Sequence, residues 1–267
     1  MRMIIGRMRK YFVIARVSFI NSITYRAPLF ARFAFYTLFI YIFMGLWGAI
    51  YREGGVNGYS YTQMVWYLIM TEGITFSCNS GVFGMMNSDI KTGSIAYQLG
   101  RPAHYVLYQF ANSAGQMLLN IILFGALAAA LGLIFVGPLP GFRLGVIPPL
   151  ALSVTLSVIQ NYFSLMLLGL SSFVIEDNSA LYLIYQKLNF MLGMFLPMEF
   201  LPEAIQRVAR NLPFSYVYWA PAKIFVGYTP ELFWQLISRQ AMWATLAVTL
   251  TMLAYNRSVR RLQVNGG

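Results

Sequence analysis

The chain offers few of the residue combinations that enzymes use for catalysis. The phosphate-binding sequence GxxxxGK[ST] and the zinc-binding sequence HExxH are both absent. One histidine (His104), one cysteine (Cys78) and eight scattered acids leave no metal-ligand cluster of the usual spacing. Glu176 and Asp177 are adjacent, so on a helix they would point to different faces. The sequence therefore predicts a protein that is not itself catalytic and binds no metal.

Three ionisable residues lie within or beside long apolar stretches: Glu72, Lys187 and Glu199. A charge inside a bilayer is costly, and such residues often mark a function. One interpretation places them on a translocation pathway or at a seam between membrane subunits. The other is that Glu72 is protonated, or paired with a neighbouring helix, and only supports the helix bundle.

The stretch Asn87–Pro102, NSDIKTGSIAYQLGRP, is the longest polar interruption in the N-terminal half of the chain. Its helix signals are a start at Gly93-Ser94, an apolar stripe of Ile95, Ala96 and Leu99, and a stop at Gly100 to Pro102. A short amphipathic helix between two membrane spans can press on lipid or on a soluble partner protein.

The composition predicts an all-α membrane protein that forms a single domain over residues 1–267. Of its residues, 58% are hydrophobic and 10% are charged, whereas soluble domains carry about 25% charged residues. A helix needs about 20 largely apolar residues to cross a bilayer. The windows that meet this length predict six transmembrane helices: Leu29–Ile50, Tyr61–Phe83, Tyr105–Phe135, Val146–Phe173, Leu181–Phe200 and Leu232–Ala254.

The net charge of +11 reflects membrane topology and not nucleic-acid binding, because the basic residues cluster at the two ends of the chain and beside the spans. The N-terminal segment is the richest in arginine, the C-terminal tail holds several more, and the Asn87–Pro102 loop adds Lys91 and Arg101. The loops near residues 51–60 and 136–145 hold one each. Both termini and the Asn87–Pro102 loop are therefore expected in the cytosol.

Residues 1–26 are expected to form an amphipathic helix that lies along the cytosolic membrane surface. At 100° per residue, one apolar stripe and one basic stripe run side by side. The apolar stripe is Ile5, Met8, Phe12, Ala15 and Phe19, and the basic stripe is Arg2, Arg9 and Arg16. This helix is either a topology anchor or a docking surface for a cytosolic subunit, and both roles are compatible.

Residues 197–231 are expected on the outer side as short broken helices, of the kind seen in re-entrant elements. Ala204–Asn211 and Ala222–Gly227 are the two helical pieces that the pattern predicts. The prolines that break the segment are Pro197, Pro202, Pro213, Pro221 and Pro230.

Two sequence patterns carry a resemblance to a known family. The first is D-I-x-x-G-x-[IL]-A-x-x-L-x-R-P in the Asn87–Pro102 loop, and the second is P-x-x-F-L-P-x-x-[IL] from Pro197, followed by Asn211, Leu212 and Pro213. With the basic N-terminal helix and the six spans, the chain resembles the membrane subunits of ABC exporters of the type-2 permease family, and is similar to permeases described as viologen or drug exporters.

The resemblance implies half of a translocation pathway in the bacterial cytoplasmic (inner) membrane. Two permeases would pair, and two cytosolic ATPase subunits, which bind ATP and Mg²⁺, would dock beneath them. It implies a role for four groups of residues. ATPase coupling falls to Asp89, Ile90, Lys91, Gly93, Ile95, Leu99, Arg101 and Pro102; the adjoining N-terminal helix contributes Arg9, Phe12, Arg16 and Phe19; the permease seam or pathway contains Glu72, Lys187 and Glu199; and the outer gate contains Pro197, Phe200, Pro202 and Pro213.

Other hypotheses stay open. A secondary transporter or channel working alone is the main alternative, although such proteins often repeat their broken helices, and here the proline-broken element occurs once. A structural membrane scaffold is a third. The cargo is expected to be a hydrophobic drug, a lipid-linked molecule or a peptide. Between an identical copy and a related chain as second permease, we favour the related chain.

Overall fold

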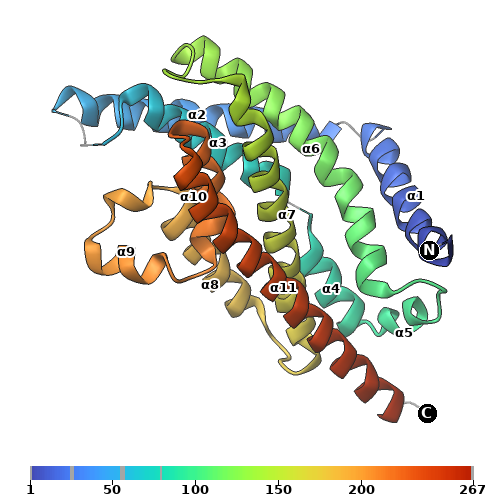
Figure 1. Cartoon of the computed structure of the whole chain (residues 1–267). Coiled ribbons are helices and arrows are strands. Elements are labelled where there is room, and N and C mark those ends of the chain that lie inside the picture. The colour runs from blue at the N-terminus through green and yellow to red at the C-terminus, as the bar shows by residue number, and fades with distance from the viewer. Residues whose placement is uncertain (1, 25–26, 55–57, 79, 266–267) are drawn as a thin grey trace.

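The computed structural model describes residues 2–24, 27–54, 58–78 and 80–265, without the side chains of residues 1–8, 25–28 and 261–267. Every regular element in these ranges is a helix, which confirms the all-α prediction (Figure 1). The predicted contributions of Ile5, Met8 and Arg2 to the N-terminal stripes lie outside the described side chains. The α-helices are α1 (Arg2–Thr24), α2 (Ala27–Arg52), α3 (Tyr61–Cys78), α4 (Val82–Lys91), α5 (Ser94–Leu99), α6 (Tyr105–Phe135), α7 (Ile147–Leu170), α8 (Ser179–Asn189), α9 (Glu203–Ala209), α10 (Phe214–Val226) and α11 (Pro230–Asn265).

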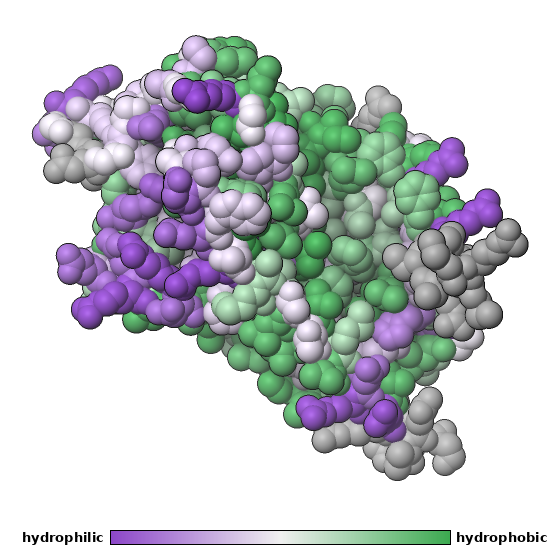
Figure 2. Space-filling view, viewed as in Figure 1, coloured by the Kyte–Doolittle hydropathy of each residue, from purple (hydrophilic) through white to green (hydrophobic). Residues whose placement is uncertain are grey.

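Three helical stretches of the described chain are long and apolar enough to cross a membrane: Leu29–Arg52, Tyr105–Phe135 and Leu144–Phe173. They correspond to the first, third and fourth predicted windows. In Figure 2 apolar side chains cover the middle of the molecule, and hydrophilic ones gather over α9 and near the end of α11. The chain is thus a multi-pass membrane protein.

The second predicted window, Tyr61–Phe83, is not one continuous helix. Helix α3 ends at Cys78, and α4 begins at Val82 after Gly81, whose φ of 63° is left-handed. Glycine adopts this conformation at little steric cost. Residues 87–91, predicted as part of a loop, continue α4 and include its last turn.

The fifth predicted window, Leu181–Phe200, is also broken. Helix α8 passes into a π-helical segment, Phe190–Met194, and helical structure stops before Pro197. At the break, two backbone carbonyl groups accept hydrogen bonds from α3. The Tyr67 hydroxyl donates to Gly193 O at 2.9 Å and to Leu196 O at 3.2 Å. Buried backbone polar groups need such partners. The break is therefore part of the core and not a frayed end.

The proline-broken segment contains a longer helix than the sequence predicts. Helix α10 runs from Phe214 to Val226 and passes through Pro221, which was expected to break it. Tyr216, Trp219 and Ala220 are buried, since α10 packs against α3 and α7. Tertiary packing on several sides stabilises a helix that local propensity disfavours.

Helix α3 lies at the centre of the bundle, in contact with α2, α6 and α10 (Figure 1). Arg32 of α2 donates a hydrogen bond to Phe76 O in the last turn of α3, and its guanidinium lies 5.0 Å from the Phe124 ring centroid. A cation at a helix C-terminus stabilises the exposed carbonyls and the helix dipole. Arg32 thus joins three helices, α2, α3 and α6.

Helices α3 and α6 approach closely at Gly132, which gives a first prediction. A Cβ at this position would overlap the Trp66 ring, and that ring is held in place because Trp66 Nε1 donates to Gly137 O at 3.1 Å. We expect Gly132→Ala to destabilise the protein by about 1–3 kcal/mol, the usual cost of overpacking. Thermal unfolding in detergent measures this effect. Gly125→Ala on the same helix is the control, since its Cβ would meet nothing within 4 Å; equal midpoints for both variants would contradict the prediction.

Candidate functional site

Helices α4 and α5 and the turn into α6 form a compact elbow, residues 82–104, at one end of the bundle (Figure 1). Gly93, with φ of 73°, makes the turn between α4 and α5. The Asp89 carboxylate binds this turn from α4: it accepts hydrogen bonds from Ser94 Oγ at 2.9 Å, Gln98 Nε2 at 2.7 Å and the Tyr105 hydroxyl at 2.6 Å. One carboxylate thus joins α4, α5 and α6, and makes the elbow a rigid unit.

The two faces of α5 differ from the sequence prediction. The predicted apolar stripe is divided: Ile95 is 2% exposed and Leu99 packs against the same core, whereas Ala96 is exposed. The outer face instead presents Tyr97, which is 77% exposed, and the Arg101 guanidinium lies 5.5 Å from its ring centroid. Among the predicted coupling residues, Lys91, Gly93, Arg101 and Pro102 are exposed, whereas Asp89 and Ile90 are half-buried.

Tyr97 was missed by the sequence analysis. It lies two residues from both Ile95 and Leu99, a separation that places it on the opposite face of a helix. That spacing was a usable signal, because an exposed aromatic residue on a solvated helix is typical of a contact surface.

Helix α1 lies against α6 and reaches the elbow. Lys10 Nζ donates to Pro102 O at 2.9 Å, and the backbone N–H of His104 donates to the Tyr11 hydroxyl at 3.2 Å. Farther along, the Ser18 hydroxyl donates to Asn112 O. The N-terminal helix and the elbow are therefore in direct contact.

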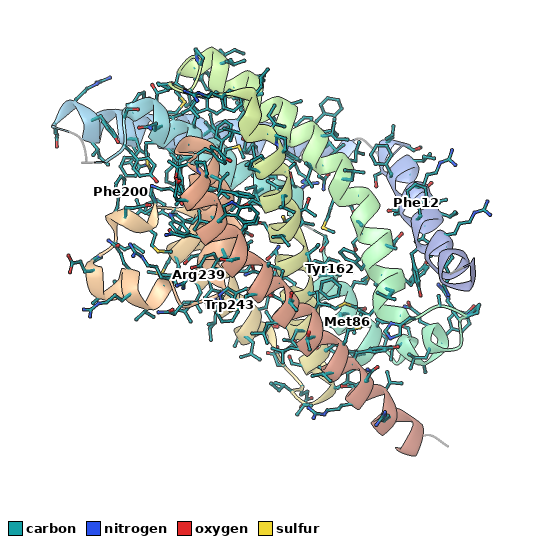
Figure 3. All side chains as sticks on the ribbon, in the orientation of Figure 1. Phe12, Met86, Tyr162, Phe200, Arg239 and Trp243 are labelled. Atoms are coloured by element: carbon teal, nitrogen blue, oxygen red, sulfur yellow. The ribbon has the colours of Figure 1, made fainter. Side chains whose placement is uncertain are left out.

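The predicted apolar stripe of α1 is divided between two environments. Phe19 is half-buried, whereas Phe12, labelled on α1 in Figure 3, is 72% exposed. Arg9 and Arg16 are exposed. The face of α1 that points away from α6 thus combines basic and apolar side chains, as expected for a helix in contact with lipid headgroups or a partner.

A second cluster lies at the opposite end of the bundle, around Glu199. Its carboxylate forms a 2.8 Å ion pair with Lys223 and lies 3.3 Å from Trp219 Nε1. The Lys223 ammonium also donates to the Tyr59 hydroxyl at 2.9 Å, and that hydroxyl lies 3.4 Å from Glu199 Oε2. Burial, and then the charge of Glu199, raise the pKa of Tyr59 well above its ordinary value, so this phenol stays protonated. The cluster ties the α2–α3 connection to the segment before α9 and to α10.

The predicted gate residues are three prolines at the starts of helical segments and one aromatic residue beside this cluster. Pro197, Pro202 and Pro213 each occupy the position just before a helical segment, where proline costs little. The ring of Phe200 lies 5.5 Å from that of Tyr59. The prolines thus precede helix starts, and Phe200 packs against Tyr59 of the cluster.

Glu199 gives a second prediction. Glu199→Gln removes the charge and leaves Lys223 without its ion pair; a partly exposed pair contributes about 0.2–1 kcal/mol. We expect hydrogen exchange in residues 197–213 to become up to about fivefold faster, because local opening costs less free energy. Glu203→Gln, at an exposed position in α9, is the matched control. An unchanged hydrogen-exchange rate in Glu199→Gln would show that the ion pair does not stabilise residues 197–213 against local opening.

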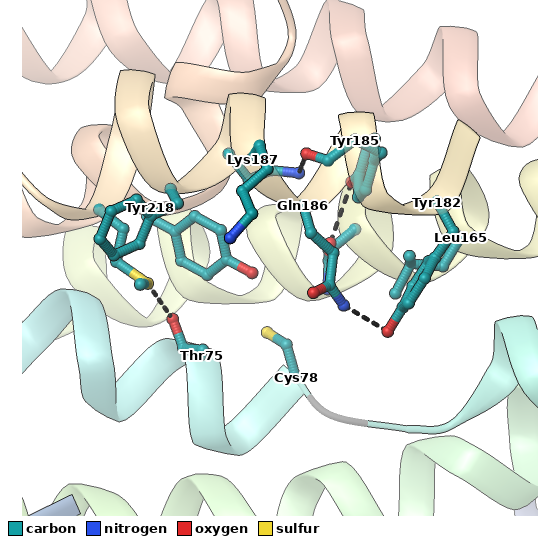
Figure 4. Close-up of a pocket in the computed structure, with 12 residues that line it drawn as sticks. Thr75, Cys78, Leu165, Tyr182, Tyr185, Gln186, Lys187 and Tyr218 are labelled. Atoms are coloured by element: carbon teal, nitrogen blue, oxygen red, sulfur yellow. Dashed lines mark hydrogen bonds between the residues drawn. The ribbon is translucent and has the colours of Figure 1, made fainter. Parts of the chain in front are cut away.

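The three predicted seam or pathway residues are not brought together. Glu72 is 4% exposed within α3, and Glu199 pairs with Lys223. Lys187 is exposed on α8, beside a polar cavity (Figure 4). Among the described side chains, no cation forms an ion pair with Glu72. The structure therefore places the three residues in different environments: Glu72 is buried in α3, Glu199 is ion-paired, and Lys187 lies beside the cavity.

These features define a class: a multi-pass helical membrane protein with a rigid polar elbow at one end and a proline-rich, ion-paired cluster at the other. The family model described as ABC-2 family transporter protein matches residues 35–266. The chain belongs to this family, and it is the transmembrane component of an ABC transporter, whose ATPase is a partner. Searches of curated proteins and of solved structures found no match to the chain.

Proposed function

We propose that the chain is the permease subunit of an ATP-driven exporter and forms half of its translocation pathway. The observation that carries the proposal is the elbow: a helix pair made rigid by Asp89 presents Tyr97 and Arg101 outward, in a chain of the ABC-2 family. In this proposal two ATPase subunits, which hold ATP and Mg²⁺, dock against the elbow. Two permeases, of which the second is a related chain, enclose the pathway.

The orientation is part of the proposal. The elbow, the start of α1 and the end of α11 lie at the same end of the bundle (Figure 1). The basic residues at both ends of the chain favour the cytosol for this end. The protein then lies in the bacterial inner membrane with six spans: α2, α3, α6, α7, the broken α8 segment and α11. The Glu199 cluster faces the outer side and closes the exit.

Transmission from ATPase to pathway follows from the packing. Helix α4 contacts α7, and α1 contacts α6, so a force on the elbow reaches two long helices through rigid contacts. ATP-driven closure of the ATPases would move these helices largely as rigid bodies. The cargo is proposed to be a hydrophobic or amphipathic molecule, because the stretches of spanning length expose many large aromatic and aliphatic side chains.

The test is affinity purification of the tagged chain in mild detergent, followed by mass spectrometry. We expect a P-loop ATPase to co-purify, and Arg101→Glu to reduce its recovery at least about tenfold, because a reversed charge faces the docking partner. Arg143→Glu is the matched control, since Arg143 is exposed between α6 and α7, far along α6 from the elbow. A chain that purifies without any ATPase, in several detergents and with ATP present, would favour a stand-alone secondary transporter or channel.

A further inference from the structure

A cavity of about 270 Å³ lies between α8 and the helices α3, α7 and α10 (Figure 4). It is near Cys78, the last residue of α3, and thus toward the part of α3 that leads to the elbow. Small-molecule sites have volumes of about 300–1,000 Å³, so this space suits a small ligand or one end of a larger one. The lining residues that matter here are Asn161 from α7, Tyr185, Lys187 and Asn189 from α8, and Tyr218 from α10.

The first requirement on an occupant comes from Asn189. Its side chain is 4% exposed, and its Nδ2 donates to Tyr185 O at 3.0 Å. Its Oδ1 has no hydrogen-bond partner among the described residues. The neighbouring amide oxygen, Asn161 Oδ1, is already occupied by the Tyr185 hydroxyl at 2.9 Å. A buried acceptor without a partner is unfavourable, so Asn189 is poised for a ligand that brings a hydroxyl or amide donor.

The second requirement comes from charge. Lys187 lines the cavity, and in Figure 4 its side chain points into the space beside Tyr218. No aspartate or glutamate lines the cavity. An ammonium group has three donors and no acceptor, so an anionic group on the occupant is the complementary partner.

The third requirement comes from shape. The phenol rings of Tyr182, Tyr185 and Tyr218 form much of the wall. Aromatic walls favour a flat ring on the ligand through stacking and edge contacts. The π-helical segment Phe190–Met194 forms one end of the cavity, and such segments occur frequently at functional sites.

We propose that this cavity is a loading subsite for an amphipathic aromatic anion that carries a hydroxyl or amide donor. Lys187 pairs with the anionic group, Asn189 Oδ1 accepts from the donor, and the tyrosine rings contact the flat body. Loading as a step of export rests on the proposed function, whereas binding of the ligand does not.

The test uses the full chain in lipid nanodiscs and equilibrium dialysis of radiolabelled 4-hydroxycinnamate, with empty nanodiscs subtracted. This probe has a carboxylate, a flat ring and a phenol donor. We expect saturable binding that Lys187→Gln weakens about tenfold or more, because a charge-assisted hydrogen bond is lost. Arg143→Gln, which removes a cation from the exposed connection between α6 and α7 and leaves the cavity untouched, is the matched control and should bind like the wild type.

The analogue 4-methoxycinnamate tests Asn189 without a mutation in the core, because it keeps the charge and the ring and lacks the donor. We expect 4-methoxycinnamate to bind the wild type about tenfold more weakly than 4-hydroxycinnamate does. We expect the two probes to bind Asn189→Ala equally weakly, because the acceptor is then missing. Three results would each overturn the subsite: no saturable binding, binding by Lys187→Gln as tight as by the wild type, or equally tight binding of the two probes by the wild type. Since no ATPase is present in this assay, these results are independent of ATPase co-purification, which tests the proposed function.

Discussion

Replacement of Asp89 by alanine is expected to uncouple ATP hydrolysis from transport while the helix bundle remains folded. The carboxylate accepts three hydrogen bonds, from Ser94, Gln98 and Tyr105, and each contributes about 0.5–1.5 kcal/mol. Their loss lowers the stabilising free energy of the elbow by roughly 2–4 kcal/mol, without a direct effect on the rest of the bundle. Gln98 would also lose one of its anchors, although Gln109 Nε2 still donates to its Oε1 at 3.0 Å.

A loosened elbow absorbs ATPase motion instead of passing it to α6 and α7. In proteoliposomes that contain the purified complex, we expect transport per ATP hydrolysed to fall at least about tenfold, since a change of 1.4 kcal/mol already shifts an equilibrium tenfold. Asp89→Asn keeps one acceptor oxygen and should fall between the alanine variant and the wild type. Asp89 acts as a positioning residue, so the ATPase should still co-purify with both variants. Full coupling in Asp89→Ala would show that these three bonds do not transmit motion.

The second large effect is expected at Gly115, where α1 lies on α6. A Cβ added here would stand 2.7 Å from the backbone nitrogen of Phe19 and 3.0 Å from Ser18 Cβ, and closer still to the carbonyl oxygen of Ala15. Backbone atoms cannot swing aside as a side-chain tip can, so Gly115→Val must push α1 away. The Ser18 hydrogen bond to Asn112 is then lost, and the contact of Lys10 with Pro102 weakens with it.

We expect α1 of Gly115→Val to become accessible to protease in detergent, with cleavage at least about tenfold faster than in the wild type, because fully packed helices open rarely. The remaining helices should keep their thermal midpoint within a few degrees, since the variant changes only the α1–α6 contact. Gly125→Val, on the same helix at a position with open space around its Cβ, should behave like the wild type. Equal protection of α1 in both variants would contradict a close α1–α6 contact.

The hydrophobic windows and the basic flanks were enough to predict a helical membrane protein. Lipid exposure demands long apolar runs, so three of the six predicted windows coincide with apolar stretches of spanning length in the structure. The start of α5 at the glycine-serine pair was also predictable, because Gly93 adopts a left-handed φ that other residues avoid. These are local properties, and local sequence patterns report them directly.

Average hydropathy could not predict the helix breaks within the second and fifth predicted segments. Residues 190–196 are as apolar as a continuous span, and the hydroxyl of Tyr67 that bonds the released carbonyls lies 126 residues away from Gly193. Pro221 in α10 was misjudged for the same reason. Its local preference opposes a helix, while burial against α3 and α7 stabilises one.

The candidate sites divide in the same way. The sequence by itself determined that Asn87–Pro102 contains a polar helix-turn unit and that Pro197–Glu231 is broken by prolines, because glycine, proline and charge act through near neighbours. Only the tertiary structure decided which side chains of these segments face outward. It turned Ile95 inward and left Tyr97 exposed, paired Glu199 with Lys223, and placed Lys187 and Asn189, with its unpartnered oxygen, on the wall of one cavity. Those outcomes depend on contacts between helices far apart in the chain, for which one sequence carries no local signal.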